Sequence, residues 1–561
     1  YVIVRATSGK LYHEDIIELI VRPAKNYRFD FRKGVSKYGF GSYTDNGKPV
    51  TLGSNLYYAL NYDPTEKNHF TKLYVDDIIP TGTNYTGTAF PKPTHYSPDN
   101  GGTWINSSPP ANAGSGYRLR WALHEIEGSG RLMKLSNGVP GMDNISENTG
   151  SSNRSVMKIG SDGNIYVCWQ DSTTGNPDNT EIFFRKWNGT QWVGIDGTPG
   201  VSNISNTGNF SSYVDMVLDS NNNPHFVWVE NWTAGWQNHY QVLYTRWNGT
   251  QLVTANGTPG YENITTSIGD LNNYLLPRIA LSNNMPNIVF GNSYSYTTQR
   301  GLYFTKWNGT QWTTITGTPG IELVSNTGSA YPYGISIGIN TQGQPHFVYE
   351  TIRYMWWFII QDDLRATKWN GSAWTGFDGT TPIFEYLMPN NRLSHSYPNI
   401  AMQGDIPHVV WSDDGVGLGQ EIVYSKYTNG AWRAANDSTG YDILSLSTDS
   451  DITPHIALLP GGLPAVIWNS QKDGIGDIHF RWFKNGWSNL LLNGPVEKIT
   501  ESDSDSTYPQ VAIASDGTPY FAMSDNKDND YDVYVTYPIM DFTTSTFPGQ
   551  IVWGAKIAEQ V

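Results

Sequence analysis

The sequence predicts an all-β protein in which a seven-bladed β-propeller is preceded by an N-terminal β-sandwich-like module. Three observations lead to this fold class. A unit of four short strands recurs at intervals of 55 to 62 residues, Asn-Gly turns recur inside that unit, and the chain is rich in Gly, Tyr and Trp but has only 16% charged residues. Repeats of four antiparallel strands are typical of propeller blades.

The repeat is clearest at the end of its second strand, where an aromatic residue or Met closes an apolar run. These residues are Trp169, Trp228, Phe290, Tyr349, Trp411, Trp468 and Met523. In the fifth repeat, segments 398–402 and 407–411 read as the first and second strands, because each is a short apolar run next to a turn.

An Asn-Gly hairpin joins the third and fourth strands of the repeat. Its sequence is Trp187-Asn188-Gly189-Thr190-Gln191-Trp192, with close copies at 247–252, 307–312 and 369–374. Asn-Gly favours a type I′ turn, since both central residues of that turn need positive φ. We interpret the flanking tryptophans as blade packing rather than as ligand contacts.

The seventh repeat has a third strand at 532–537, but no Asn-Gly hairpin follows it. Segment 131–146, upstream of the first repeat, is similar to the end of a complete blade. We therefore expect an N-terminal strand to close the ring, which removes exposed sheet edges.

The chain is thereby divided into three parts. Residues 1–128 form the β-sandwich-like module, 129–545 the propeller with its closing strand, and 546–561 a C-terminal tail. Alternating runs such as 27–31 and 117–123 predict strands in the first part.

Charge and hydropathy exclude some partners. The net charge of -15 and the lack of clustered Lys and Arg argue against nucleic acid, and no apolar stretch is long enough for a membrane span. The chain starts without Met or a signal-peptide pattern, so we expect a processed or trimmed product. The single cysteine, Cys168, lies in an apolar run and reads as a small buried side chain.

Glycosylation sequons are frequent, and those in the hairpins are Asn188, Asn248, Asn308 and Asn370. They predict a glycoprotein with an extracellular or cell-surface location.

Acidic residues follow the end of the second strand in five repeats. They are Asp171, Glu230, Glu350, Asp413 and Asp525, and they predict an acidic rim on one face of the propeller that binds a cation or the hydroxyls of a glycan. The alternative is that these side chains cap turns. Trp356 and Trp357, in an apolar loop, are a candidate platform for a sugar or a partner, or else pack over the propeller.

Alternating carboxylates in two loops predict a calcium site. Asp528, Asp530 and Asp532 lie in one loop, and Asp503 and Asp505 in the loop before the last repeat. Calcium takes six to eight oxygen ligands, but the glycine and terminal Glu of an EF-hand are absent, so solvated acidic loops remain the alternative. The recurring His225, His346, His408 and His455 indicate packing of the repeats rather than zinc binding.

Over the repeat region the chain resembles secreted propellers of the sialidase and BNR-repeat type and, more loosely, propeller lectins. Segment 97–104 fits the Asp-box of that family, Ser-x-Asp-x-Gly-x-Thr-Trp, which implies a β-hairpin turn, although here it lies outside the repeats. A sialidase also needs an arginine triad, a Tyr/Glu nucleophile pair and an acid/base Asp. Arg154, Arg278 and Arg353 lie near strands, but no motif places them together.

The favoured function is a non-enzymatic propeller that binds glycans or a surface protein. One alternative is a sialidase-like glycoside hydrolase, or a lyase, using carboxylates such as Asp171, Glu230 or Asp413. A pair of carboxylates roughly 5 to 10 Å apart around one pocket would favour it. A further alternative is a structural subunit of a surface assembly, with possible self-assembly.

Overall fold

The computed structural model describes the backbone of most of the propeller and of the strands that precede it. The described residues are 2–6, 17–21, 27–31, 42–45, 48–51, 56–62, 70–78, 95–98, 105, 117–125, 133–134 and 550–553, and 142–538 except 147, 149, 173–178, 235–236, 269–270, 272–275, 293–298, 329, 356–357, 382, 388–394, 417–418, 446, 473, 485, 489–496, 501–503 and 527–529.

The chain divides into two compact units, and the first consists of Tyr1–Gly141 with Pro538–Val561. Its five-stranded sheet has the order β1 (Val2–Ala6), β6 (Leu56–Tyr62), β7 (Phe70–Ile78), β9 (Arg118–Glu125), β8 (His95–Ser97). A second sheet contains β2 (Ile17–Val21), β3 (Tyr27–Phe31) and β45 (Gln550–Trp553), and β4 (Ser42–Asp45) pairs with β5 (Lys48–Thr51). The β-sandwich packing and the boundaries after residues 128 and 545 stay predictions.

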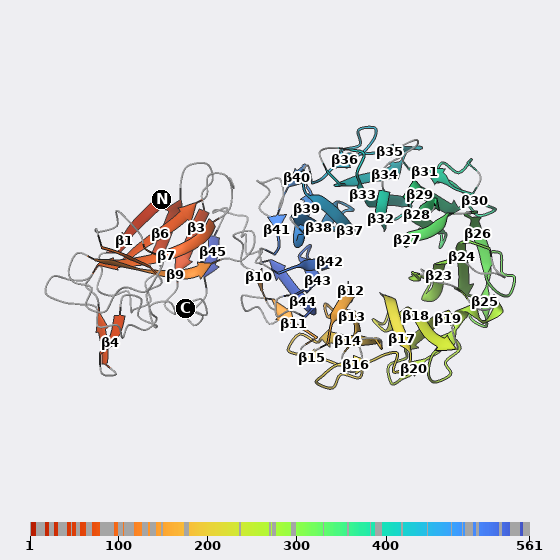
Figure 1. Cartoon of the computed structure of the whole chain (residues 1–561), viewed down its shortest axis with the longest axis horizontal. Coiled ribbons are helices and arrows are strands. Elements are labelled where there is room, and N and C mark those ends of the chain that lie inside the picture. The colour runs from red at the N-terminus through yellow and green to blue at the C-terminus, as the bar shows by residue number, and fades with distance from the viewer. Residues whose placement is uncertain are drawn as a thin grey trace. The chain divides into compact units, whose positions relative to one another are not determined.

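The second unit, Met142–Tyr537, is a ring of seven blades around a central opening (Figure 1). Each blade is an antiparallel sheet whose outermost strand consists of two short pieces, both paired with the third strand. The predicted all-β fold and seven-bladed propeller are confirmed. Within the described part of the chain, no helix is long and apolar enough to cross a membrane.

The strands of the seven blades follow in chain order. Blade 1 contains β12 (Ser152–Ile159), β13 (Ile165–Asp171), β14 (Glu181–Trp187), β15 (Trp192–Val193) and β16 (Ser202–Asn203); blade 2, β17 (Phe210–Leu218), β18 (Pro224–Ala234), β19 (Gln237–Trp247), β20 (Leu252–Val253) and β21 (Glu262–Asn263), followed by the short helix η1 (Ile264–Ser267). Blade 3 contains β22 (Arg278–Ser282), β23 (Met285–Asn292), β24 (Gly301–Trp307), β25 (Trp312–Thr313) and β26 (Glu322–Asn326); blade 4, β27 (Tyr331–Ile339), β28 (Pro345–Met355), β29 (Phe358–Trp369), β30 (Trp374–Thr375) and β31 (Glu385–Tyr386). Blade 5 contains β32 (His395–Gln403), β33 (Ile406–Asp413), β34 (Glu421–Thr428), β35 (Ala431–Arg433) and β36 (Asp442–Ile443); blade 6, β37 (Ser450–Leu458), β38 (Pro464–Lys472), β39 (Ile475–Phe483), β40 (Trp487–Ser488) and β41 (Glu497–Lys498); blade 7, β42 (Ser506–Ile513), β43 (Pro519–Asp525) and β44 (Asp532–Pro538).

The start of the propeller closes the ring on its last blade, as predicted. β11 (Asp143–Asn144) pairs with β44, and the N–H of Ile145 donates to the carbonyl of Val533 at 2.9 Å. The Ser146 hydroxyl donates to Asp532 at 2.5 Å and accepts from the N–H of Val533 at 3.0 Å. Another short strand, β10 (Met133–Lys134), lies in the segment where the sequence predicts one.

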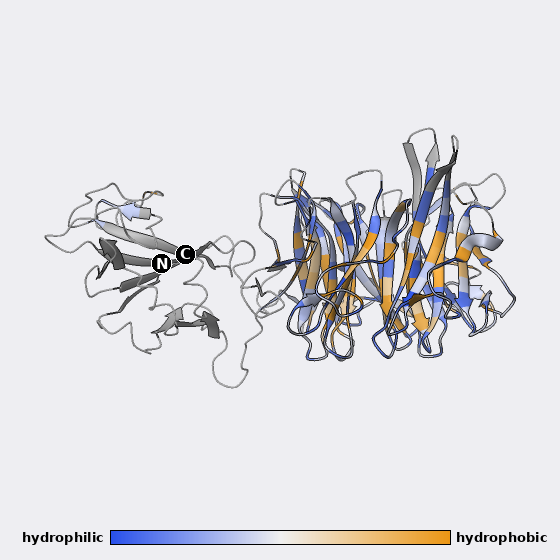
Figure 2. Ribbon diagram, turned by 90° about the horizontal axis from the view of Figure 1, so that it is seen from below, coloured by the Kyte–Doolittle hydropathy of each residue, from blue (hydrophilic) through white to orange (hydrophobic). Residues whose placement is uncertain are grey.

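The core lies between neighbouring blades. The ribbon coloured by hydropathy shows hydrophobic residues recurring along the propeller strands (Figure 2). Trp169, Trp228, Trp411 and Trp468 are at most 1% exposed. Each Å² of apolar surface that is buried contributes about 25 cal/mol to stability. These large buried rings are therefore major contributors. Cys168 is likewise buried, and burial raises the pKa of its thiol, so the prediction of a small structural side chain is confirmed.

The Asn-Gly hairpins differ in part from the prediction. In blade 5, Thr428 pairs with Ala431, and Asn429 and Gly430 both have positive φ, as a type I′ turn requires. In the four tryptophan-flanked copies the loop is longer, and Gly189, not Asn188, has positive φ. The type I′ prediction is wrong there, because the side-chain Oδ1 of Asn188 accepts from the N–H of Thr190 and caps the loop.

The second hairpin tryptophan joins blades 3, 4 and 5 to the preceding blade. The indole N–H donates to a Glu of the preceding blade in the pairs Trp312 to Glu262 (3.1 Å), Trp374 to Glu322 (3.3 Å) and Trp432 to Glu385 (2.8 Å). These bonds confirm the interpretation of the hairpin tryptophans as packing residues.

We expect Glu262→Ala to destabilise the propeller by about 2 kcal/mol, since it leaves the Trp312 indole and the N–H of Ala255 without their acceptor. Urea unfolding followed by tryptophan fluorescence measures the loss. Glu262→Gln keeps one acceptor oxygen and serves as the matched control, for which a smaller loss is expected. Equal stability of both variants and the parent chain would contradict this role.

Candidate binding site at the central channel

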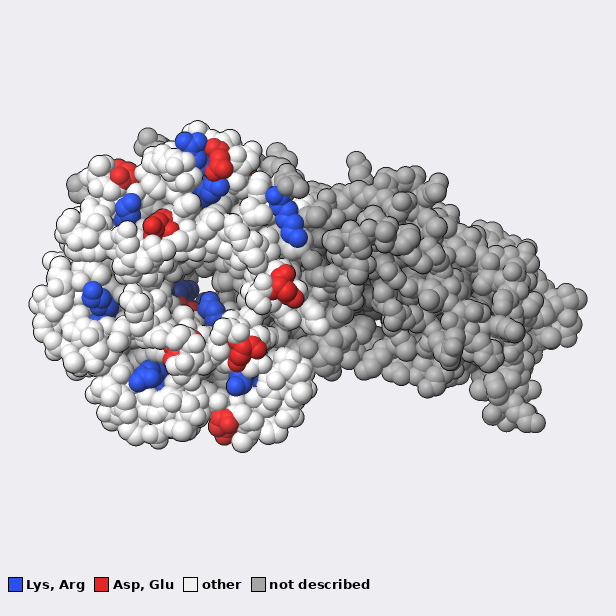
Figure 3. Space-filling model, turned by 180° about the vertical axis from the view of Figure 1, so that it is seen from behind, with Lys and Arg blue, Asp and Glu red and all other residues white. Residues whose placement is uncertain are grey.

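The first strand of every blade lines the central channel, which encloses a cavity of about 430 Å³. The strands are β12, β17, β22, β27, β32, β37 and β42, so all seven blades contribute side chains. A cavity of this size lies in the range of small-molecule sites. In the view of Figure 3, atoms of Lys or Arg lie at the central opening of the propeller.

One residue near the start of each first strand has left-handed backbone geometry. These residues, which we call the mouth ring, are Arg154, Tyr213, Leu276, Gly334, Tyr397, Thr453 and Tyr508, with φ between 39° and 55°. A β-bulge accompanies six of them. A non-glycine residue in such a conformation costs roughly 1 to 3 kcal/mol, and such strain is concentrated at binding and active sites.

The mouth ring is rich in aromatic side chains. The guanidinium carbon of Arg154 lies 4.6 Å from the ring centroids of both Tyr213 and Tyr508, so the cation is held between two aromatic faces. Across the ring, Tyr397 and Tyr333 meet edge to face at 6.3 Å, and Tyr397 is 37% exposed. Gly334 is closely packed here, since a Cβ would lie only 2.9 Å from Pro398 Cδ.

Polar side chains two residues beyond the mouth ring bind the first strands to one another. Each accepts from a backbone N–H of the next blade: Asp215 from Ile279 (3.0 Å), Ser336 from Ile400 (3.2 Å), Asn399 from Ile456 (3.1 Å) and His455 from Val511 (3.3 Å). These bonds satisfy strand-edge groups that would otherwise face the channel unpaired.

Cationic side chains also line the channel beyond Arg154. Lys158 comes from β12 and Arg278 from β22, and Asp215 is the carboxylate among the described lining residues. Burial lowers the pKa of Arg278, and the nearby Arg154 lowers it further while Asp215 opposes the shift. Within the described chain, no ion pair joins Arg154, Lys158 or Arg278 to a carboxylate.

Four residues of the predicted acidic rim are buried within the blades. Asp171 accepts from the Trp169 indole (2.8 Å), Glu230 from Trp228 (3.1 Å) and Asp413 from Trp411 (3.1 Å), while Asp525 accepts from the hydroxyls of Ser504 (2.7 Å) and Ser506 (2.5 Å). Their exposed fractions are 0 to 7%. This geometry matches the alternative of local capping, and ligand binding by these carboxylates stays a prediction.

The fifth predicted rim residue lies near the mouth ring. Glu350 is buried opposite Tyr333 in the β27–β28 ladder, and its charge contributes to the raised pKa of both Tyr333 and Tyr397, for which burial is the main cause. Trp356 and Trp357 lie outside the described residues.

The predicted calcium ligands are described in part. Asp503 and Asp528 lie outside the described residues. Asp505 accepts from the N–H of Gly476 at 2.8 Å, Asp532 accepts from Asn144 at 2.8 Å, and burial raises the pKa of Asp530. Among the described residues, no three or more His, Cys, Asp or Glu side chains gather as a metal site, and calcium stays a prediction.

The structure describes part of two other predicted features. Tyr96 and Ile105, on either side of segment 97–104, exchange backbone hydrogen bonds of 3.0 and 2.8 Å, as a hairpin requires. The hairpin sequon residues Asn188, Asn248 and Asn308 are exposed, as is Asn370.

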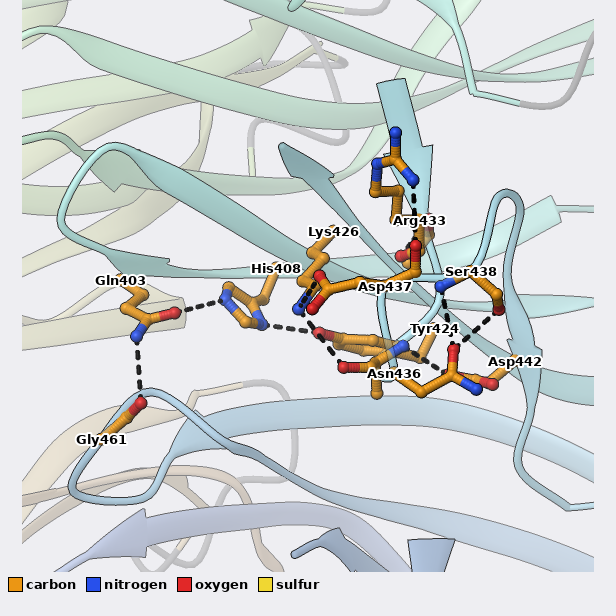
Figure 4. A network of polar contacts seen from close by, with 12 residues as sticks. Gln403, His408, Tyr424, Lys426, Arg433, Asn436, Asp437, Ser438, Asp442 and Gly461 are labelled. Carbon is orange, nitrogen blue, oxygen red and sulfur yellow. Dashed lines mark hydrogen bonds and ion pairs between the residues drawn. The ribbon is translucent and has the colours of Figure 1, made fainter. Parts of the chain in front are cut away.

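Three of the recurring histidines, His225, His346 and His408, are packing residues, as the sequence indicates. The His408 ring lies between Gln403 and the hydroxyl of Tyr424, and Gln403 reaches the carbonyl of Gly461 in the next blade (Figure 4). His225 contacts the Tyr244 hydroxyl in the same way at 2.7 Å. Burial lowers the pKa of His225, His346 and His408 to about 4 each, and that of His455 to about 3.

The mouth ring was not predicted, although the sequence carries a signal for it. In four blades the strained residue precedes a proline and then a polar residue and Ile or Val: Leu276-Pro277-Arg278-Ile279, and the segments starting at Tyr397, Thr453 and Tyr508. The polar residue is a channel-lining side chain each time. Comparing this position across blades would have identified the channel.

The structural similarities that comparisons with known proteins find are distant, and they transfer no activity. No protein-family model and no curated protein matches the sequence. Similar solved structures include a protein of unknown function from Dyadobacter fermentans (10% identity, 74% of this chain and 98% of that one, TM-score 0.40) and an ulvan lyase of polysaccharide lyase family PL25 (11%, 81% and 94%, TM-score 0.42). Trypanosoma rangeli sialidase in complex with the inhibitor DANA is also similar (10%, 72% and 57%, TM-score 0.37). The resemblance to sialidase propellers is confirmed at this level.

The buried histidines predict acid destabilisation. Because the pKa of His225 and His408 is about 4 in the folded chain against 6.5 normally, the unfolded chain takes up protons first as the pH falls. The stability that the neutral rings contribute is fully present above pH 6.5. The free energy of unfolding then falls between pH 6.5 and 4, by on the order of 3 kcal/mol per residue. Urea unfolding at pH 7.5 and 5.0 measures this. The double variant His225→Asn/His408→Asn keeps an acceptor for each Tyr hydroxyl and should show a smaller pH dependence; an unchanged dependence would assign the effect to other groups.

Proposed function

We propose that this protein is a non-enzymatic glycan-binding propeller that holds a saccharide at the mouth ring. The observation that carries the proposal is the set of tyrosines around Arg154 at the entrance of a cavity of about 430 Å³. Sugar rings stack their C–H faces on aromatic rings, while polar groups in the same pocket fix their orientation. The mouth ring offers both kinds of contact.

The chemistry of the channel favours binding over hydrolysis. Glycosidases with two carboxylates need one as acid and one as base or nucleophile. Among the described lining residues the carboxylate is Asp215, and its oxygens accept from the N–H groups of Met216 (2.9 Å) and Ile279 (3.0 Å). These bonds assign Asp215 to the structure of the ring.

A sialidase-like hydrolase is the second candidate, because Tyr333 and Glu350 face each other across β27 and β28 near the mouth ring. A tyrosine nucleophile with a neighbouring Glu is what that mechanism needs. Against it, burial and the charge of Glu350 raise the pKa of Tyr333, which disfavours the phenolate.

We further propose an extracellular or cell-surface location, with a surface glycan or glycoprotein as partner. The exposed sequons at Asn188, Asn248, Asn308 and Asn370 support it. Calcium dependence of binding and self-assembly of the chain are further parts of this proposal, and the binding experiment below varies calcium. Glycopeptide mass spectrometry of the protein from its native source should find glycans at these turns, and unmodified peptides at all four would count against a glycosylated exterior.

A glycan array, with and without calcium, should identify a saccharide that binds without being cleaved. Titration calorimetry with that saccharide should then show roughly 10-fold weaker binding for Tyr213→Ala and for Tyr508→Ala, since each removes one aromatic face. Tyr441→Ala is the matched control, because Tyr441 is 41% exposed and does not line the cavity. Unchanged affinity in both mouth variants would place the site elsewhere, and release of a product would favour the hydrolase.

A further inference from the structure

We propose that the channel holds an acidic group of the bound saccharide, a carboxylate or a sulfate ester, between the side chains of Arg278 and Lys158. The inference rests on the proposed function and names the chemical class of its ligand.

The two cations enter one cavity from different blades. Arg278 lies two residues beyond the mouth ring on β22, and Lys158 lies four residues beyond it on β12, so their backbones are roughly 7 and 13 Å farther along the strands. The charges of both act on His455 of blade 6. Both side chains line the same cavity as His455.

The donors of Arg278 are largely unused. A guanidinium carries five N–H groups in a planar fork. The described contact of Arg278 is one bond of 3.0 Å from Nη1 to the carbonyl of Pro277, and no described carboxylate forms an ion pair with it. The remaining fork matches two oxygens of a carboxylate or sulfate.

The channel is positive within an acidic protein. Arg154, Lys158 and Arg278 face one lining carboxylate, Asp215, whereas the whole chain has a net charge of -15. Desolvated cations that outnumber the carboxylates of a cavity cost free energy, which an anionic ligand recovers. A neutral sugar leaves that cost in place.

His455 supplies a neutral hydrogen-bond donor to the same cavity. The Nδ1 atom of His455 accepts from the N–H of Val511, so the neutral ring carries its proton on Nε2. Burial keeps this ring neutral, with a pKa of about 3. His455 lines the same cavity and adds a hydrogen-bond donor without adding a charge.

Calorimetry on the full chain tests the proposal with three oligosaccharides that share one neutral backbone: unmodified, carboxylated as a uronate, and sulfated. We expect an acidic form to bind roughly 10- to 100-fold more tightly than the neutral one. Arg278→Gln should remove this preference. Comparing uronate with sulfate ester identifies the acidic group.

Lys158→Met is the second variant and should reduce the same preference if Arg278→Gln fails to fold. Arg433→Gln is the matched control, because Arg433 lies on the outer piece β35 and bonds the carbonyl of Asp437. Equal affinity for neutral and acidic forms, or a preference that both channel variants retain, overturns the proposal.

Inorganic sulfate separates the two proposals. If no saccharide binds but sulfate binds in a way that requires Arg278, the anion site is supported and the glycan-binding function fails. If neutral and acidic saccharides bind equally, the glycan-binding function is supported and the anion site fails.

Discussion

The structure depends on how seven separate sheets meet at one axis. The first strand of each blade pairs on one side only, so the N–H groups of its other edge need acceptors that no strand supplies. Side chains such as Asp215 and Asn399 provide them by accepting from the next blade at 3.0 and 3.1 Å. The bonds run from blade to blade, so they fix the spacing of the first strands and with it the width of the channel.

That constraint also creates the binding site. A bulge turns the chain at the start of six of the seven first strands, and the residue in the bulge takes positive φ whether it is Gly334 or a bulky residue such as Tyr508. The backbone is thus common to all blades, while the side chain varies from blade to blade. Binding chemistry at the mouth can change without loss of the packing between blades, which depends on residues such as Trp228 on the second strand.

Sequence alone predicted what repeats and missed what varies. The period of the anchors and the closing segment near Asn144 fixed the seven blades, because these patterns reflect packing that every blade needs. Contacts between side chains from different blades could not be predicted in this way. Arg154 and Tyr508 are distant in sequence, and their contact at 4.6 Å follows from ring closure, which a strand pattern does not specify in three dimensions. The predicted type I′ turn was wrong for a local reason, because the Asn188 side chain accepts a hydrogen bond within the loop.

The acidic rim illustrates why position in a strand does not identify a ligand group. Residues i and i+2 of a strand point to the same side, so Asp171 and Asp413 come to lie beside the indole N–H of Trp169 and Trp411. A carboxylate in that place satisfies a buried donor, so it is used within the blade.

The cations of the channel have no such internal partner among the described residues. At physiological salt, the surface charge of an acidic protein is screened beyond about 8 Å. Charges within the channel are screened less, so the local positive field, and not the net charge of -15, governs which ligands enter.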